Sequence, residues 1–492
     1  MICVPSETIR TIQAALDLAE DGDAVVIAPG EYIITEPLQI TKSIHLLCVD
    51  EVGNSAVLVF NGGLLRPATP LLRLDAVSCR IKGVHLVYNH NVELAAESAV
   101  ARACAVVVGK GSATLDECRI ESSCGGVRVL EGAYGTLLCV KVTSGTTAID
   151  VEGRLFADRC DVLDSRVGIH INVVAEAQVK TCCFRQCHTA FLIKGQGFGK
   201  LDSNMIVQGS VGIHLDLPLF PRRLSVIQGN EFSLQATASI VVTGAQPACD
   251  ISKNYFHNVT GAGVVLDASS QYVQVKGNAF KNCTVGVRIT GGASASIEGN
   301  VIEESSDAAI VIISSRPTCR LNEIIRSNVG VKVTTSSNAH PADVDMHADP
   351  HIEGNTFGEN QVNLLVVAAG GTFLKNNLLQ AFKENIILDS VAPINSILSG
   401  NAICGSMSSS CIVIMGGAIG RFTYNVISGA KLSGILLDGS GFSEIESNTF
   451  RGCQCAVTAT GQAAGSIKEN TLNDLTIEIY SDSRHSILNY QN

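Results

Sequence analysis

Apolar and polar residues alternate in short runs along most of the chain, and one six-residue pattern recurs within them. It reads apolar, polar, small or polar, Asn, any residue, and then Phe, Ile or Leu, as in Ile297–Ile302. Four successive copies contain Asn254, Asn278, Asn300 and Asn322, at intervals of 24, 22 and 22 residues. This period is typical of solenoid proteins. No segment of helical period separates the copies, so we expect short strands joined by tight turns.

Such strands predict an all-β fold, a single-stranded right-handed parallel β-helix. Each turn would rise by one strand spacing, about 4.8 Å, and would pack only on its neighbours. We expect roughly 18–20 turns on this basis. The right hand follows from the crossover rule for parallel strands. Because a solenoid grows by adding turns, residues 1–492 are predicted to form one β-helix domain.

The repeated Asn residues predict a ladder inside the coil. Stacked one turn apart, their amides would bond to one another, and a buried amide without such bonds costs about 1–3 kcal/mol. Upstream, Cys118, Val140, Cys160 and Cys182 continue the register, and Cys suits the same pocket as a compact hydrophobe. The predicted structural ladder consists of Asn204, Asn230, Asn254, Asn278, Asn300, Asn322, Asn355, Asn376, Asn401, Asn425, Asn448 and Asn470.

The N-terminal segment predicts a capping helix. Between residues 8 and 23, Ile12 and Leu16 lie on one helical face, and Gly22 is placed to end the helix. A helix over 8–23 would cover the open end of the apolar interior, as the terminal repeat of a solenoid requires.

Two parts of the sequence resemble known families. The pieces Thr11–Gln13, Gly22–Asp23, Pro29–Gly30 and Tyr32 resemble the start of pectin-lyase-like right-handed β-helix proteins. The Asn-x-Phe repeats resemble the CASH repeats of F-box-type β-helix proteins, Shc-binding proteins and bacterial copper-maturation proteins. The resemblance implies a right-handed β-helix over nearly the whole chain. It leaves the function open, because this fold hosts lyases, esterases, hydrolases, epimerases and non-enzymes.

Charge and composition narrow the partners. The net charge of −11 argues against nucleic acid and anionic membrane, which both require a basic surface. No apolar run approaches the roughly 18–20 residues of a membrane span. The first residues lack the basic and apolar regions of a secretory signal, so the 18 cysteines are expected to be reduced thiols and the protein cytoplasmic.

The interval from Asn322 to Asn355 is 33 residues, about eleven longer than its neighbours. We therefore expect a loop insertion at residues 334–350, and loops on rigid scaffolds often carry function. Acids and imidazoles alternate there, so on an extended segment they would share one face and could hold a divalent cation. The alternative is a solvated polar loop, because no fixed metal-site spacing is matched. The candidate catalytic and metal-binding residues are Asp345, His347, Asp349 and His351.

An enzyme is the alternative functional hypothesis. Asp349-Pro350-His351 resembles the core motif of alginate C5-epimerases, although the residues that usually flank that motif are missing. The resemblance implies a carbohydrate-active enzyme, a polysaccharide lyase or C5-epimerase, with carbohydrate as its ligand. The motifs of pectinesterases and polygalacturonases are absent, and the chain has no Trp, the commonest sugar-stacking residue. An enzyme is therefore disfavoured, and apart from the candidate cation no cofactor is expected.

A second outward column is predicted along Arg128, Asp150, His170, Leu192 and His214. His170 and His214 could form an acid–base pair two turns apart. The alternative is an ordinary mixed polar surface.

The segment 217–223 predicts a protein contact, because Leu and Phe stand beside Arg in a stretch stiffened by Pro. The alternative is that Leu219 and Phe220 fold back over the coil. The candidate protein-binding residues are Leu217, Leu219, Phe220, Arg222 and Arg223. The leading hypothesis is a non-enzymatic recognition or assembly scaffold that binds a protein partner along a stacked-strand face.

Overall fold

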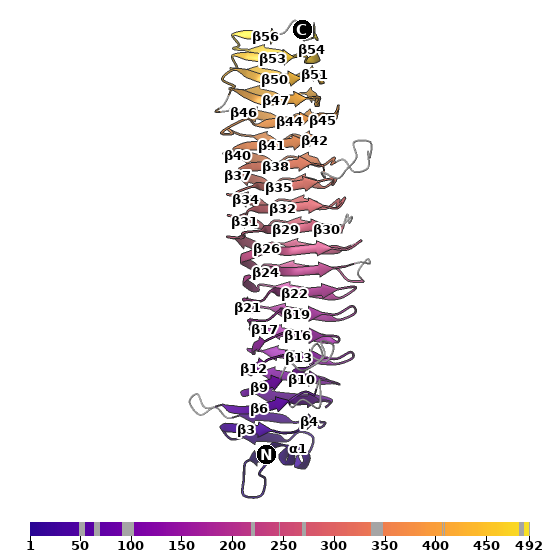
Figure 1. Cartoon of the computed structure of the whole chain (residues 1–492), viewed down its shortest axis with the longest axis vertical. Helices are drawn as coiled ribbons and strands as arrows, with labels where there is room; N and C mark the ends of the chain where they lie inside the picture. The colour runs from indigo at the N-terminus through magenta and orange to yellow at the C-terminus, as the bar shows by residue number, and fades with distance from the viewer. Residues whose placement is uncertain are drawn as a thin grey trace. The chain divides into compact units, whose positions relative to one another are not determined.

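The computed structural model describes residues 1–48, 55–62, 69–90, 103–217, 222–245, 247–267, 272–335, 348–405, 407, 409–481 and 487–491. They group into two compact units, Met1–Ile240 (unit 1) and Val241–Asn492 (unit 2). Each unit is a stack of parallel strands (Figure 1). Strands make up 62% of the structure, in about 19 turns, which confirms the all-β parallel solenoid. The assignment of residues 1–492 to a single domain stays a prediction.

A turn of unit 1 consists of three strands, and each pairs in parallel with the equivalent strand of the next turn. Thus β14, β15 and β16 pair with β17, β18 and β19, with Leu137 opposite Ala157 and Val142 opposite Val162. The strands around the sites described below are β13 (Gly125–Val129), β14 (Tyr134–Leu138), β15 (Lys141–Ser144), β16 (Thr147–Val151), β17 (Arg154–Asp158), β18 (Asp161–Leu163), β19 (Val167–Ile171), β20 (Glu176–Lys180), β22 (Thr189–Lys194), β23 (Phe198–Asp202) and β25 (Ser225–Gln228).

Unit 2 repeats the same three-strand turn. Its first and last complete turns are β27 (Ala248–Ser252), β28 (Tyr255–His257) and β29 (Ala262–Asp267), and β54 (Ala464–Lys468), β55 (Thr471–Asn473) and β56 (Ile477–Ser481). The strands that matter below are β35 (Ala308–Ile313), β36 (Thr318–Arg320), β38 (Val329–Thr334), β39 (His351–Glu353), β41 (Val362–Val367), β42 (Gly371–Leu374), β43 (Asn377–Leu378), β44 (Ile386–Ser390) and β45 (Asn395–Ser399).

The alternation of the sequence explains which side chains fill the interior. In β30 (Tyr272–Lys276) the two valines are buried and the three residues that alternate with them are exposed, as the period of two along a strand requires. The residue two places after each ladder position is also buried, for example Phe256 and Phe280. The rings of these two residues stack with centroids 4.5 Å apart. The interior is therefore built from columns of equivalent residues in successive turns.

The asparagine ladder lies inside both units. In unit 2, the Oδ1 atom of Asn300 accepts hydrogen bonds from the backbone N–H and the Nδ2 group of Asn278, at 2.9 and 3.0 Å. The Nδ2 group of Asn300 donates to the carbonyl of Val275 and to Oδ1 of Asn322, both at 2.9 Å. In unit 1, Asn204 makes the equivalent bonds to Asn230. Each amide bonds on both sides, which explains why the sequence repeats Asn at this position.

The residue before each ladder position adopts a left-handed backbone. Gly277 and Gly299 both have φ of +61°, and Leu321, at the same point of the next turn, has φ of +54°. This conformation turns the chain sharply between the first and second strands and favours Gly, because a Cβ atom there strains the backbone. It accounts for the frequent Gly just before the repeated Asn.

The cysteines upstream occupy the ladder register. The Sγ atom of Cys182 accepts a hydrogen bond from the backbone N–H of Cys160 at 3.3 Å, in the place where Oδ1 of an Asn would accept it. The backbone N–H of Cys182 in turn donates to Oδ1 of Asn204 at 3.0 Å. The sulfur column and the amide ladder are therefore one continuous feature of unit 1.

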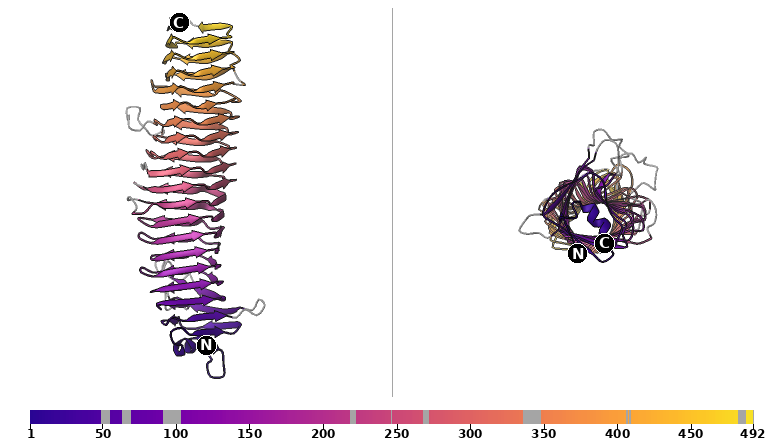
Figure 2. Two further views of the ribbon diagram at one scale, coloured as in Figure 1. Left: turned by 180° about the vertical axis from the view of Figure 1, so that it is seen from behind. Right: turned by 90° about the horizontal axis from the view of Figure 1, so that it is seen from below.

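The N-terminal helix α1 covers Ile12–Leu18, a shorter range than the predicted 8–23. The Oγ1 atom of Thr11 caps it by accepting from the backbone N–H of Ala14. Ile12, Ala15 and Leu16 are buried against β1 (Ile2–Val4), β2 (Ala24–Ile27) and β4 (Leu38–Ile40). Seen along the coil, α1 lies across the interior at the N-terminal end of unit 1 (Figure 2). Among the described residues, no helix is both long and apolar enough to cross a membrane.

Candidate functional site

Surface hollows in both units lie at one corner of the coil. We call this the loop corner, meaning the segments that connect the third strand of one turn to the first strand of the next. In unit 1 the loop corner has four residues at 130–133, two at 152–153 and four at 172–175. The short connection between two longer ones leaves a notch of about 680 Å³. Tyr134 lies on one wall of this notch and Val174 on the other.

Charged side chains line the notch. Glu152 on its floor is paired with Arg128, whose Nε lies 3.1 Å from Oε1 of the glutamate. Glu176 is paired with Arg223 at 3.0 Å and lies 3.8 Å from Arg154. Glu131 is exposed and forms no ion pair within the described part of the chain. Two of the three carboxylates are thus held by arginines.

A polar network lies next to the floor of the notch. Oδ1 of Asp150 lies 3.1 Å from Nδ1 of His170 and accepts a hydrogen bond from Nδ2 of Asn172 at 2.7 Å. Burial would raise the pKa of Asp150, but the hydrogen bond and charge of His170, together with Asn172 and Arg128, lower it below its ordinary value. In the register of the strands, Leu192 lies between His170 and His214. The outward column is therefore formed as predicted, and the two imidazoles are separated by an apolar side chain.

The predicted protein-binding segment falls partly on this surface. Leu219 and Phe220 lie outside the described residues. Leu217 is fully buried, so it faces the interior rather than a partner. Arg222 and Arg223 are exposed and line a recess of about 130 Å³ next to the notch.

The same recess contains residues that the sequence analysis did not single out. Val174 and Phe198 line it, and the guanidinium of Arg223 lies over the ring of Phe198, 5.6 Å from its centroid. Val173 and Val174 are 55% and 61% exposed. Two adjacent valines in a connection between strands could have indicated this surface, because such residues are more often buried.

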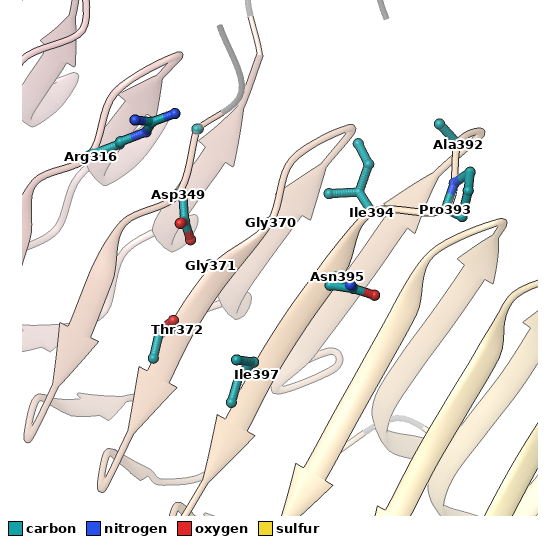
Figure 3. Close-up of a pocket in the computed structure, with 11 residues that line it drawn as sticks. Arg316, Asp349, Gly370, Gly371, Thr372, Ala392, Pro393, Ile394, Asn395 and Ile397 are labelled. Atoms are coloured by element: carbon teal, nitrogen blue, oxygen red, sulfur yellow. The ribbon is translucent and has the colours of Figure 1, made fainter. Parts of the chain in front are cut away.

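In unit 2, the loop corner contains a groove of about 560 Å³ (Figure 3). Arg316 and Asp349 lie on one side of it. Ala392, Pro393, Ile394 and Asn395 lie on the other side. The backbone of Gly370 and Gly371 runs between the two sides, and Thr372 and Ile397 lie further along their strands.

One of the predicted catalytic and metal-binding residues, Asp349, lines the groove. Asp349 is exposed there, whereas Nε2 of His351 lies 3.4 Å from Oε2 of Glu353, outside the lining. Asp345 and His347, with most of the predicted insertion 334–350, lie outside the described residues. Within the described ranges, no three His, Cys, Asp or Glu side chains are placed to share a metal ion. The four-residue cation site and the enzyme hypothesis built on it stay predictions.

Comparison with known families identifies the fold. The family model described as "Right handed beta helix region" matches residues 238–403, and that of the periplasmic copper-binding protein NosD matches residues 339–492. The right-handed parallel β-helix is thereby confirmed. The narrower resemblance to CASH repeats stays a prediction. No curated protein matches the sequence.

Several solved structures are similar at low identity. The tailspike protein of the E. coli bacteriophage HK620 is 9% identical, with a TM-score of 0.43 over 84% of this chain and 74% of that one. The surface adhesin PfbA of Streptococcus pneumoniae is 12% identical, with a TM-score of 0.34 over 74% and 89%. A PL6 family polysaccharide lyase from Pseudopedobacter saltans is 11% identical, with a TM-score of 0.29 over 72% and 83%.

The predicted cytoplasmic location is contradicted by one of these comparisons. The family matched over residues 339–492 is described as periplasmic. The prediction depended on the absence of a signal-like start, from which the reduced state of the cysteines was also inferred. The cysteines do not distinguish the compartments, because a buried thiol packs as a small hydrophobe whichever compartment surrounds the protein.

Proposed function

We propose that the protein is a non-enzymatic β-helix recognition scaffold that binds a protein partner at the loop corner of unit 1. One observation carries this proposal: exposed Val173 and Val174 lie beside the recess that Phe198, Arg222 and Arg223 line. We call these five residues the contact surface.

The composition of the contact surface favours a protein partner. When a partner covers exposed apolar side chains, the removal of their surface from water stabilises the complex by about 25 cal/mol per Å². Aromatic and arginine side chains are also enriched at protein interfaces. Glu176 and Phe198 hold Arg223 in place, which reduces the side-chain entropy lost on binding. Arg222 forms no ion pair among the described residues, so a carboxylate on the partner would complement it.

The ion pairs of the notch argue against a glycosidase mechanism at this place. Glycoside hydrolysis generally requires two carboxyl groups, one of them able to donate a proton. Glu152 and Glu176 are each engaged by a guanidinium, that of Arg128 and that of Arg223, so neither lies free of a partner in the notch. A recognition role uses these pairs directly, because they fix the shape of the surface.

The proposal can be tested by affinity capture with cross-linking mass spectrometry. The bait would be the full chain, and extract from its source organism would supply candidate partners. Val174→Glu and Arg222→Glu each change the contact surface. Val77→Glu is a matched control, because Val77 lies in an equivalent connection of unit 1 and is 82% exposed.

We expect one partner to cross-link near the contact surface of the wild-type chain and of Val77→Glu. Binding of that partner should fall by roughly tenfold or more in each of the other variants, as expected for central interface residues. Equal binding of the partner by all four proteins would refute the proposal. Cross-links confined to other faces of the coil would do the same.

A further inference from the structure

The groove of unit 2 has a specific cause in the sequence. Gly371 lies opposite Ser396 in the strand register, so Gly370 lies opposite Asn395, and Asp349 occupies the same place one turn earlier. A Cβ atom on Gly370 would lie 2.5 Å from the backbone oxygen of Asn395, and one on Gly371 would lie 2.8 Å from the ring of Phe373. Neither position accepts a side chain without a shift. Gly371 faces the interior, like buried Ser396 opposite it, so Gly370 is the glycine that stands in the outward column. The outward column is therefore interrupted for one turn.

The interruption sets the width of the groove. Asp349 and Asn395 belong to turns that are two strand spacings apart, about 9.6 Å between backbones. The volume of about 560 Å³ falls within the range of small-molecule sites.

The chemistry of the lining is two-sided. Arg316 and Asp349 are exposed neighbours on adjacent turns, and neither side chain forms an ion pair or hydrogen bond with another described residue. Across the groove, Pro393 and Ile394 form an apolar side, to which Asn395 adds one amide (Figure 3). A ligand that satisfies both sides carries an anion and a cation close together, and an apolar group beyond them.

We propose that this groove binds a small zwitterion with an apolar tail, with its carboxylate on Arg316 and its ammonium on Asp349. A guanidinium matches the two oxygens of a carboxylate, and an ammonium donates to the carboxylate of Asp349. The apolar tail lies against Pro393, Ile394 and Ile397. Two sources share this chemistry, a free α-amino acid with a large aliphatic side chain and a short zwitterionic peptide. The proposal is independent of the contact surface in unit 1.

Calorimetric titration of the full chain tests the proposal with defined probes. The zwitterions are L-leucine and leucyl-leucine. The comparison compounds are 4-methylpentanoate, which lacks the ammonium, 3-methylbutylamine, which lacks the carboxylate, and methyl glucoside as a neutral sugar. We expect at least one zwitterion to bind to the protein. Each single-charge compound should bind roughly tenfold or more weakly than that zwitterion, because each lacks one charge-assisted contact. The zwitterion that binds more tightly identifies the source.

Variants locate the site. Arg316→Gln and Asp349→Asn should each lower the affinity for the zwitterion, again by roughly tenfold or more. Thr372→Phe should block the groove. Thr318→Phe is the matched control, because Thr318 lies in the same outward column two turns earlier and outside the lining. Circular dichroism spectra equal to that of the wild type would show that each variant is folded.

Three results would overturn the proposal. One is that neither zwitterion binds at millimolar concentration. Another is that methyl glucoside binds and the zwitterions do not, which would assign the groove to a sugar. The last is that Thr372→Phe and Thr318→Phe bind the zwitterion equally, which would place binding elsewhere on the chain.

Discussion

Unit 2 and the upstream part of unit 1 build the same interior corner from different chemistry. In unit 2 the ladder is made of amides, and the bonds that Oδ1 accepts from the Asn one turn earlier are 2.9 to 3.1 Å long. In the upstream part of unit 1 the same places are filled by Cys118, Val140, Cys160 and Cys182, and a sulfur accepts the backbone N–H at 3.3 Å. The backbone conformation before the ladder position is left-handed in both. The corner therefore depends first on the shape of the backbone, and the side-chain hydrogen bonds add to it.

The largest effect is expected from removing an amide of unit 2. Asn300→Ala removes the acceptor of two buried donors of Asn278 and the donor to the carbonyl of Val275, whereas Oδ1 of Asn322 keeps the backbone N–H of residue 300. We expect the free energy of unfolding to fall by about 3 kcal/mol. Urea denaturation followed by circular dichroism measures this loss. Asn377→Ala is the control, because Asn377 is exposed, and an equal loss there would contradict a special role for the ladder.

The sulfur part of the corner should be sensitive to alkaline pH, unlike the amide part. Burial raises the pKa of the Cys118 thiol from its ordinary value of 9.0 to about 11. Between these values the unfolded chain loses the proton first. The stability contributed by this thiol is therefore complete below pH 9 and is lost as the pH rises towards 11, by up to about 2–3 kcal/mol.

Denaturation of the wild type and of Cys118→Ala between pH 8 and pH 11 measures this dependence. The free energy of unfolding should fall more steeply with pH for the wild type than for Cys118→Ala. The difference in slope should correspond to the release of about one proton on unfolding. Parallel curves for the two proteins would show that Cys118 does not titrate as described. The same comparison with Asn300→Ala should give parallel curves, because an amide does not ionise in this range.

A smaller effect is expected where sulfur replaces the amide. Cys182→Ala removes a weak acceptor and one buried atom, so we expect a loss of about 1 kcal/mol in the free energy of unfolding. Urea denaturation under reducing conditions measures it. A loss as large as that of Asn300→Ala would mean that the two parts of the corner depend equally on their side-chain bonds.

The last effect, of similar size, tests the backbone that both units share. Leu321 has φ of +54° and is 65% exposed, so Leu321→Gly relieves strain and loses little burial. We expect the free energy of unfolding to rise by about 1 kcal/mol, as measured by thermal or urea denaturation. Gly299→Ala, at the equivalent place one turn earlier, should cause a loss of similar size. A loss in both variants would show that Leu321 is held by contacts rather than strained.

The interior was predictable because it is periodic. The intervals between ladder residues and the apolar residue two places later determine which side chains face inward, and the structure places Asn300 and Phe280 accordingly. The hollows were not predicted, because they depend on differences between neighbouring turns. The signal was nevertheless present: Val140 to Cys160 is 20 residues, whereas the intervals on either side are 22. The interval is two residues shorter because the connection 152–153, which forms the floor of the notch, has two residues where its neighbours have four.

The local sequence did not predict which way some single side chains face. Leu217 was expected at a protein contact but is buried, because its sequence neighbours say little about which way a residue faces where a strand ends. The groove of unit 2 is defined by the side chain that Gly370 lacks. The sequence alone does not indicate that Gly370 stands where the neighbouring turns carry Asp349 and Asn395.

The left-handed residue and the ladder fix each turn at the corner between its first and second strands, so differences in turn length are absorbed mainly at the loop corner. Intervals between ladder residues range from 20 to 33, and those described here differ mainly between the third strand and the next first strand. Evolution can therefore add or remove residues at the loop corner without changing how successive turns align. For protein engineering, the same property marks the short 152–153 connection as a place to graft a foreign peptide while the hydrogen-bonded frame stays intact.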